Sequence, residues 1–235
     1  MAYHFTYVSK HDPEVQKRHT ELCTLIREVQ NQVRKKFTFQ YKFIGSYSRN
    51  MITWDSKSNI GYDFDVNIEP NLEEIDCSPK EIMSALQNAL NKSAPKFGFD
   101  PPEASTSVLT IKVKDKKHSR ILFSCDFAVV DNYEDDDGNE RQEYIRFNKK
   151  QNAYQWCERG EGYYMLPEKI KWLKENDLWG EMRELYIVNK NDVRNKSLHS
   201  RTVFANTVHQ VCQKNGFFDY EDNDPQTPIW YGLHT

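Results

Sequence analysis

The strongest constraint on the fold is the strict alternation of apolar and polar side chains over residues 62–69, YDFDVNIE. Such alternation is typical of a strand with one face against a core. The polar face carries Asp63 and Asp65, whose side chains at i and i+2 are neighbours. The two like charges repel each other unless a cation lies between them, and carboxylate oxygens are the ligands that Mg²⁺ prefers. The pattern predicts a strand with a cation site, and a solvent-exposed charged face is the alternative.

A third carboxylate interrupts an apolar run. Asp126 lies within RILFSCDFAVV, residues 120–130, which also predicts a strand. A carboxylate in such surroundings costs free energy unless it has a partner. An antiparallel pairing with the strand over 62–69 would bring Asp126 beside Asp63 and Asp65. Three carboxylates would suit a two-metal site for phosphoryl transfer. A surface position is the alternative for Asp126 taken alone.

A Gly-Ser pair ends another predicted strand, which covers residues 37–44. Gly45 lacks the Cβ that would prevent a close approach of the backbone to a ligand. Ser46 offers a hydroxyl and a backbone N–H at the start of the next helical turn, where free N–H groups attract phosphate. An ordinary strand-to-turn Gly-Ser is the alternative, because the dipeptide is common. Combined with Asp63 and Asp65, the pair predicts a site for a metal–nucleotide complex.

The remaining pattern predicts an α+β domain followed by helices. Asp12-Pro13 and Ser78-Pro79 are typical helix starts and precede apolar residues at helical spacing. Residues 46–53 are expected to form a short helix or turn, and residues 54–60 a loop. The pattern becomes mostly helical after residue 150, so we expect domains over 1–150 and 151–235. The core of the helical lobe is expected to contain most of six aromatic side chains: Tyr154, Trp156, Tyr163, Tyr164, Trp172 and Trp179.

The composition is that of an intracellular globular protein. The 235 residues include 38% hydrophobic and 13% aromatic side chains, which is enough for a sizeable core. The formal net charge of −3 gives no general attraction to nucleic acid, although it leaves room for a local basic surface. We therefore have no strong indication of duplex DNA binding. Five cysteines without a CxxC motif argue against a disulfide framework or a structural zinc site. No secretory leader or membrane span is apparent, so a cytoplasmic location is expected.

Together these motifs resemble those of the DNA polymerase β-type nucleotidyltransferase superfamily. The resemblance rests on Ile44-Gly45-Ser46, on Asp63-Phe64-Asp65-Val66 and on Asp126, and it covers roughly residues 12–147. It implies a mixed or antiparallel sheet with flanking helices and a C-terminal helical lobe. Sixteen residues separate Ser46 from Asp63, which is more than in many members. The longer interval implies a loop over the site, formed by residues 54–60.

The resemblance also implies an activity and its cofactors. The expected enzyme transfers an NMP group from an NTP donor to a hydroxyl acceptor with two Mg²⁺ or Mn²⁺ ions. Gly45 and Ser46 would bind the β- and γ-phosphates of the donor. Asp63 and Asp65 would hold both metal ions, whereas Asp126 would hold the catalytic metal and help to activate the acceptor hydroxyl.

The helical lobe of such enzymes usually faces the cleft, which adds three candidates for phosphate contacts: Lys190, Lys196 and Arg201. Exposed surface charge is the alternative for each of them. The acceptor stays open among a nucleotide, an RNA end, a protein side chain and a small molecule. A non-catalytic nucleotide-binding or antitoxin-like interaction module with the same fold is the main alternative function. A metal-dependent nuclease would explain the carboxylates but gives no role to Gly45-Ser46.

Overall fold

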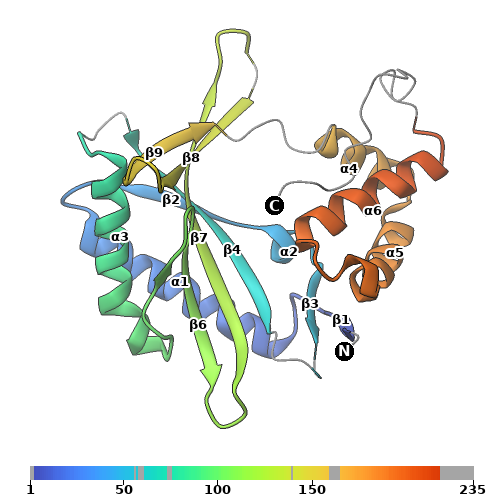
Figure 1. Ribbon diagram of the computed structural model, residues 1–235, viewed down its shortest axis with the longest axis horizontal. Coiled ribbons are helices and arrows are strands. Elements are labelled where there is room, and N and C mark those ends of the chain that lie inside the picture. The colour runs from blue at the N-terminus through green and yellow to red at the C-terminus, as the bar shows by residue number, and fades with distance from the viewer. Residues whose placement is uncertain are drawn as a thin grey trace. The chain divides into compact units, whose positions relative to one another are not determined.

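The chain forms two compact units. The computed structural model describes residues 3–55, 57, 61–72, 76–138, 140–158 and 165–217. The first unit contains the described residues up to Glu158, and the second contains those from Met165 to Phe217 (Figure 1). Each unit buries its own set of apolar side chains.

A seven-stranded mixed sheet forms the centre of the first unit, with the strand order β2-β4-β7-β6-β5 and with β8 and β9 continuing from β7. Its strands are β2 (Phe39–Ile44), β4 (Tyr62–Pro70), β5 (Glu103–Ala104), β6 (Leu109–Asp115), β7 (Arg120–Glu134), β8 (Glu140–Asn148) and β9 (Ala153–Glu158). The strand β4 is antiparallel to β2 and parallel to β7, whereas β6 and β8 are both antiparallel to β7. The α+β class with a mixed sheet, predicted from the sequence, is confirmed.

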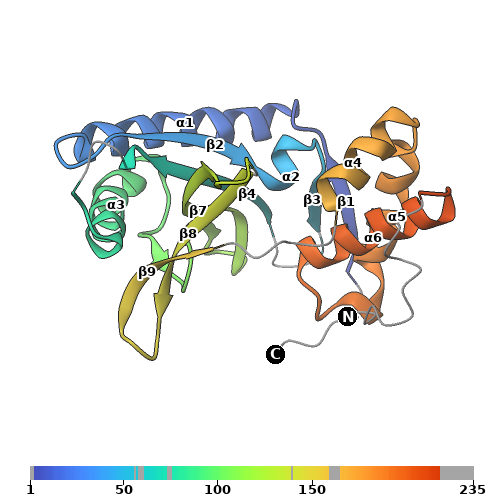
Figure 2. The same cartoon turned by 90° about the horizontal axis from the view of Figure 1, so that it is seen from above.

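Two helices, α1 (Pro13–Val33) and α3 (Pro79–Ser93), pack on one face of this sheet (Figure 2). Asp12 caps α1 by accepting from two backbone N–H groups, and Ser78 forms a reciprocal capping box with Glu81. The helices share one core with the apolar residues of β4 and β7, among them Phe64 and Phe127. Burial of each such side chain contributes roughly 2 kcal/mol. The polar residues of both strands therefore lie on the opposite face, away from α1 and α3.

A smaller sheet corrects one expectation. The strand β1 (Phe5–Val8) pairs antiparallel with β3 (Ile52–Asp55), so residues 52–55 are a strand and not turn or loop. Asp55 is buried and accepts hydrogen bonds from the backbone N–H groups of His4 and Lys57. This pairing joins segments more than 40 residues apart, which local periodicity does not reveal. The short helix α2 (Gly45–Ser48) precedes β3, and residues 56 and 58–60 of the expected loop lie outside the described residues.

Two of the six aromatic residues expected in the core of the helical lobe do not lie there. Tyr154 and Trp156 lie in β9 and pack against the core of the first unit. The Tyr154 ring lies 5.0 Å from the Phe147 ring across the β8–β9 hairpin. Tyr154 and Trp156 are two residues apart, which is the spacing of side chains on one face of a strand. The helical pattern that follows after residue 165 makes this short strand difficult to recognise in the sequence. Tyr163 and Tyr164 lie outside the described residues.

The second unit consists of the helices α4 (Leu166–Glu175), α5 (Trp179–Asn191) and α6 (Ser200–Lys214). Leu173, Met182 and Val208 are fully buried among them. Trp172 packs on Phe217 and Trp179 on Phe204, with ring centroids 5.3 Å and 6.4 Å apart. Among the described residues, no helix has both the length and the apolar character that crossing a membrane requires.

Candidate active site

The parallel pairing of β4 and β7 groups three carboxylates on one face of the sheet. Asp65 is paired directly with Asp126, and Asp63 is paired with Ser124. Paired residues point to the same face, so Asp63, Asp65 and Asp126 lie together on the face opposite to α1 and α3. The antiparallel pairing expected from the sequence is wrong. The connection from β4 to β7 contains α3, which gives the chain the length that a parallel crossover needs.

Two hydroxyl groups orient these carboxylates. Thr110 lies opposite Asp126 on β6, and its Oγ1 donates to Asp126 Oδ1 at 2.6 Å. The Ser124 hydroxyl donates to Asp63. A hydrogen bond to a charged group contributes roughly 1.5–3 kcal/mol. Each hydroxyl therefore restricts the rotation of one carboxylate.

Gly45 lies at the junction of β2 and α2 and contacts Asp65. Its φ of +65° is in the left-handed region, which residues with a Cβ rarely adopt. A Cβ at this position would lie 2.0 Å from Asp65 Oδ2. The Asp65 carboxylate therefore lies directly against the backbone of Gly45, and any other residue would displace it. Ser46 follows in α2, a helix of only four residues, and is half-buried.

The carboxylate of Asp65 is electrostatically strained. Burial, followed by the negative charges of Asp63 and Asp126, raises the pKa of Asp65 to about 6, and the nearby Arg49 guanidinium opposes the shift. A rise of the pKa from its ordinary value of 3.8 to about 6 corresponds to about 3 kcal/mol of free energy that disfavours the ionised form. A bound cation would relieve this repulsion, because it adds positive charge where three carboxylates meet.

The donor atoms at this site fit a hard divalent cation. In the part of the chain that the structure describes, no three His, Cys, Asp or Glu side chains enclose a metal position as they stand. The cluster nevertheless offers only oxygen ligands, since Cys125 is fully buried in the core on the opposite face. Oxygen donors suit Mg²⁺ or Mn²⁺ and are a poor match for softer metals. Asp63, Asp65 and Asp126 are therefore the residues that would hold such ions.

We expect Asp65→Asn to stabilise the protein when no metal is present. The folded state favours the protonated carboxyl, so its contribution to stability is full below about pH 4 and is lost as the pH rises through 6. The neutral amide keeps that contribution at pH 7.5, where the expected rise in Tm is roughly 5 °C or more. Thermal unfolding in EDTA measures this effect, with the exposed turn residue Asp136→Asn as the control. A lower Tm for Asp65→Asn, or an equal difference at pH 4 and pH 7.5, would contradict the expectation.

Three further residues at this site could not be selected from the sequence. Thr110 and Ser124 lie on the same face as the carboxylates. The only feature of the sequence that indicates this is their alternating position within the predicted strands. Asn67 follows Asp65 on that face and is buried, and its side-chain oxygen accepts no hydrogen bond from the described residues. All three positions become informative only when the neighbouring strands and their register are known.

The candidates in the helical lobe lie in the second unit. Lys190 is near the end of α5, with Nζ 5.7 Å from the centroid of the Tyr186 ring. Lys196 directly follows the 3₁₀ helix Val193–Asn195, Arg201 lies in the first turn of α6, and both are exposed. All three belong to the second unit, and their contact with phosphate stays a prediction.

Comparison with known proteins gives matches among solved structures. No protein-family model matches the chain, and no curated protein sequence matches it. The CdnE cyclic dinucleotide synthase of Elizabethkingia meningoseptica, solved with GTP and Apcpp, has a TM-score of 0.51 at 14% identity, over 88% of this chain and 79% of that chain. The Vibrio cholerae DncV cyclic AMP-GMP synthase, solved with a linear intermediate, has a TM-score of 0.54 at 15% identity, over 88% and 56%. The Rhodothermus marinus CdnE c-UMP-AMP synthase has a TM-score of 0.51 at 10% identity, over 86% and 71%.

These identities are low, and the likeness therefore concerns the fold. This chain also spans little more than half the length of the Vibrio enzyme. The matched synthases belong to the polymerase β-type superfamily, which is the superfamily that the sequence motifs resemble. The chain has the DNA polymerase β-type nucleotidyltransferase fold.

Proposed function

We propose that this protein is a metal-dependent nucleotidyltransferase that transfers an NMP group from an NTP to a hydroxyl acceptor. The observation that carries the proposal is the grouping of Asp63, Asp65 and Asp126 on one sheet face, with Asp65 against the backbone of Gly45. The pKa of Asp65 is raised first by burial and then by the charges of Asp63 and Asp126, and bound cations would offset both effects. If the charged face of this strand were only exposed surface, the tight contact between Gly45 and Asp65 would have no explanation.

In the proposed reaction the acceptor oxygen attacks the α-phosphorus of the NTP. The bond between the α-phosphorus and the bridging oxygen breaks, and pyrophosphate leaves. Bound Mg²⁺ or Mn²⁺ ions would neutralise charge on the attacking and leaving oxygens. Because Gly45 has no side chain, its backbone would approach the β- and γ-phosphates of the NTP. The Ser46 hydroxyl would contact the same phosphates. Asp126, oriented by Thr110 through one oxygen, keeps its second oxygen to receive the acceptor proton.

We further propose a second nucleotide as the acceptor. All three structural neighbours described above are named as synthases of cyclic nucleotide products. This chain covers 79%, 56% and 71% of those three chains. An RNA end, a protein side chain and a small molecule are the outcomes that would replace this part of the proposal.

Calorimetric titration with non-hydrolysable NTP analogues separates an enzyme of this kind from a simple interaction module. We expect at least one analogue to bind in the presence of Mg²⁺ and to bind at least about tenfold more weakly in EDTA, since the phosphates and carboxylates then repel each other. Binding that is indifferent to metal would favour the interaction module. Absence of binding to all four analogues with both Mg²⁺ and Mn²⁺ would contradict the proposed function. Metal-dependent cleavage of nucleic acid without NTP binding would favour the nuclease.

A further inference from the structure

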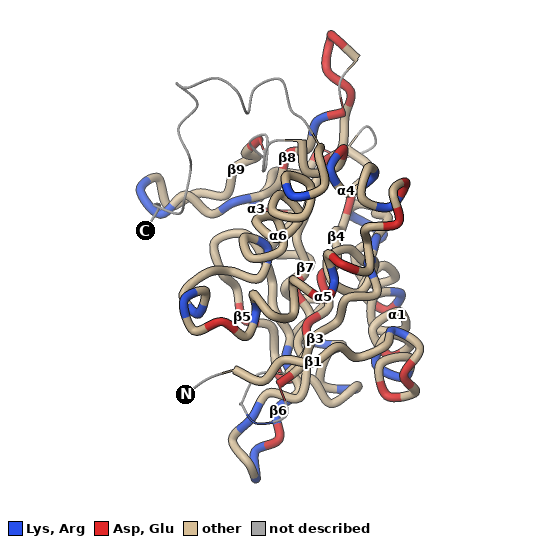
Figure 3. Tube along the Cα trace, turned by 90° about the vertical axis from the view of Figure 1, so that its right-hand side faces the viewer, with Lys and Arg blue, Asp and Glu red and all other residues tan. Residues whose placement is uncertain are grey.

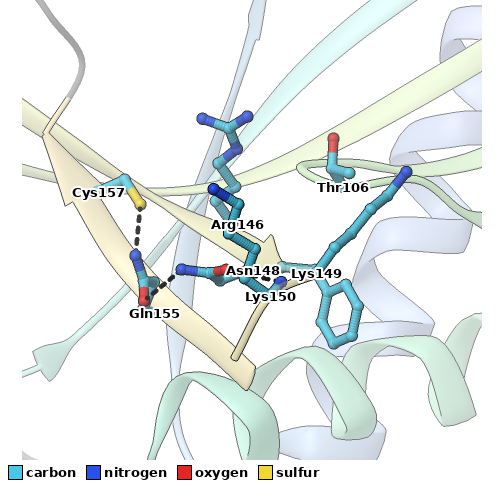
Figure 4. A pocket seen from close by; sticks show the side chains of 8 residues that line it. Thr106, Arg146, Asn148, Lys149, Lys150, Gln155 and Cys157 are labelled. Carbon is cyan, nitrogen blue, oxygen red and sulfur yellow. Dashed lines mark hydrogen bonds between the residues drawn. The ribbon is translucent and has the colours of Figure 1, made fainter. Parts of the chain in front are cut away.

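A concave site lies on the β8–β9 hairpin of the first unit. It is a pocket of about 390 Å³, within the usual range for sites that bind small molecules. The residues that line it come from the hairpin and from the segment before β6: Thr106, Arg146, Phe147, Asn148, Lys149, Lys150, Gln155 and Cys157 (Figure 4). None of them belongs to the carboxylate cluster described above.

The register of the hairpin explains how the pocket forms. Arg146 is paired with Gln155, and their side chains share one face of the hairpin. Ile145, which precedes Arg146 on β8, points to the other face and is fully buried in the core. The Phe147 N–H donates to the Thr106 carbonyl at 2.6 Å, which fixes the segment before β6 along the edge of β8. The pocket is therefore built on the folded hairpin, with Lys149 and Lys150 in its turn.

Three cations line this pocket, and none of its described lining residues is acidic. Arg146, Lys149 and Lys150 extend from the hairpin and its turn, and no Asp or Glu is among the lining residues (Figure 4). None of the three forms an ion pair with a described residue. The whole protein has a net charge of −3, and Figure 3 shows Lys and Arg at several places along the chain together with Asp and Glu. All three side chains are exposed, and their combined positive charge would attract an anionic ligand.

The remaining polar side chains bond to one another. Asn148 Nδ2 donates to Gln155 Oε1 at 3.5 Å, and Gln155 Nε2 donates to Cys157 Sγ at 3.6 Å. Asn148 Oδ1 accepts from the backbone N–H of Lys150 at 3.0 Å. These bonds fix the amide groups in the wall of the pocket. The ligand-binding donors that stay available are the charged groups, which suit phosphate oxygens.

We infer that this pocket binds a phosphate-bearing small molecule of about nucleotide size. The limited volume and the absence of a continuous basic strip disfavour a long nucleic acid. The pocket lies farther along β7 than the carboxylates: Val130 on β7, which is fully buried, pairs with Tyr144, and Tyr144 pairs with the pocket residue Cys157. Four residues of β7, or about 13 Å, separate Asp126 from Val130. The ligand is either the acceptor nucleotide, a reading that rests on the proposed function, or an effector that does not react.

Calorimetric titration of the full chain with inorganic tripolyphosphate in EDTA tests this inference. The test variant is Arg146→Gln combined with Lys150→Gln. The matched control is Lys116→Gln combined with Lys117→Gln, which removes the same charge from the exposed β6–β7 turn. We expect binding at least tenfold weaker in the pocket variant and within twofold of wild type in the control. Equal binding by the pocket variant and wild type would overturn the inference, as would an equal loss in the control.

Kinetics then distinguish the two sources of the phosphate group. A rise of fivefold or more in the KM of one nucleotide, with kcat unchanged, assigns the pocket to the acceptor. Unchanged kinetics together with lost tripolyphosphate binding assigns it to an effector, and both outcomes support the site. If the protein consumes no NTP, the proposed nucleotidyl transfer fails, while the tripolyphosphate titration still decides whether the pocket binds phosphate.

Discussion

Replacement of Asp63, Asp65 or Asp126 by asparagine is expected to lower kcat/KM for NTP consumption by at least about 1,000-fold. A factor of this size corresponds to roughly 4 kcal/mol of transition-state stabilisation, which is reasonable for the loss of a ligand to catalytic metal ions. The three residues act as one unit, because they lie on adjacent strands and the charges of Asp63 and Asp126 raise the pKa of Asp65. We therefore expect the double variants to be little worse than the single ones.

The matched control for these variants is Glu69→Gln. Glu69 lies on β4 on the same face as Asp63 and Asp65, beyond Asn67, and it is paired with Gln40 of β2. Its replacement should keep kcat/KM within about threefold of wild type. Activity is measured as pyrophosphate release, and thermal unfolding confirms that each variant is folded. An aspartate variant that retains a tenth or more of the wild-type activity would remove that residue from the proposed site.

The second large effect is expected from Gly45→Ala, which should lower kcat/KM by at least about 100-fold. The new Cβ would overlap Asp65 Oδ2, which lies 2.0 Å from its ideal position, so the carboxylate must move. Displacement of a reacting group by about 1 Å can cost a factor of this size. The left-handed φ of +65° adds a backbone cost of roughly 1–2 kcal/mol in stability.

Gly98→Ala is the control that separates these two causes. Gly98 follows the 3₁₀ helix Ala94–Phe97 with a φ of +77°, and a Cβ there would meet no atom within 4 Å. It should show a similar loss of stability in urea unfolding and unchanged activity. If Gly45→Ala retained full activity, or if Gly98→Ala lost as much, the contact between Gly45 and Asp65 would have no role in catalysis.

The sequence predicts much of this fold because its signals are local. The caps at Asp12 and Ser78 predict the starts of α1 and α3, and the alternation over 62–69 predicts β4. The strands β1 and β3 were missed because each is stabilised by a distant segment and neither alternates clearly. The direction of the pairing between β4 and β7 was also wrong, since two strands of either orientation can place Asp126 near Asp65.

The site is predictable to the same degree. Residue type and spacing were enough to select the three aspartates and Gly45, whose proximity the structure now shows. Thr110 and Arg49 could not be selected, because their value depends on which side chains they face across strands and turns. The basic pocket was equally hidden, since Arg146 and Gln155 become neighbours only through the hairpin register.

The most direct test of the central claim is incubation of the purified protein with each of the four NTPs and Mg²⁺ or Mn²⁺, followed by mass analysis of the products. The account predicts release of pyrophosphate and a new product that carries an added NMP group. Both should disappear in Asp63→Asn and persist in Glu69→Gln. Release of NDP and inorganic phosphate would contradict the account, because the attack would then be at the γ-phosphorus. Unchanged NTP under every condition would contradict it as well.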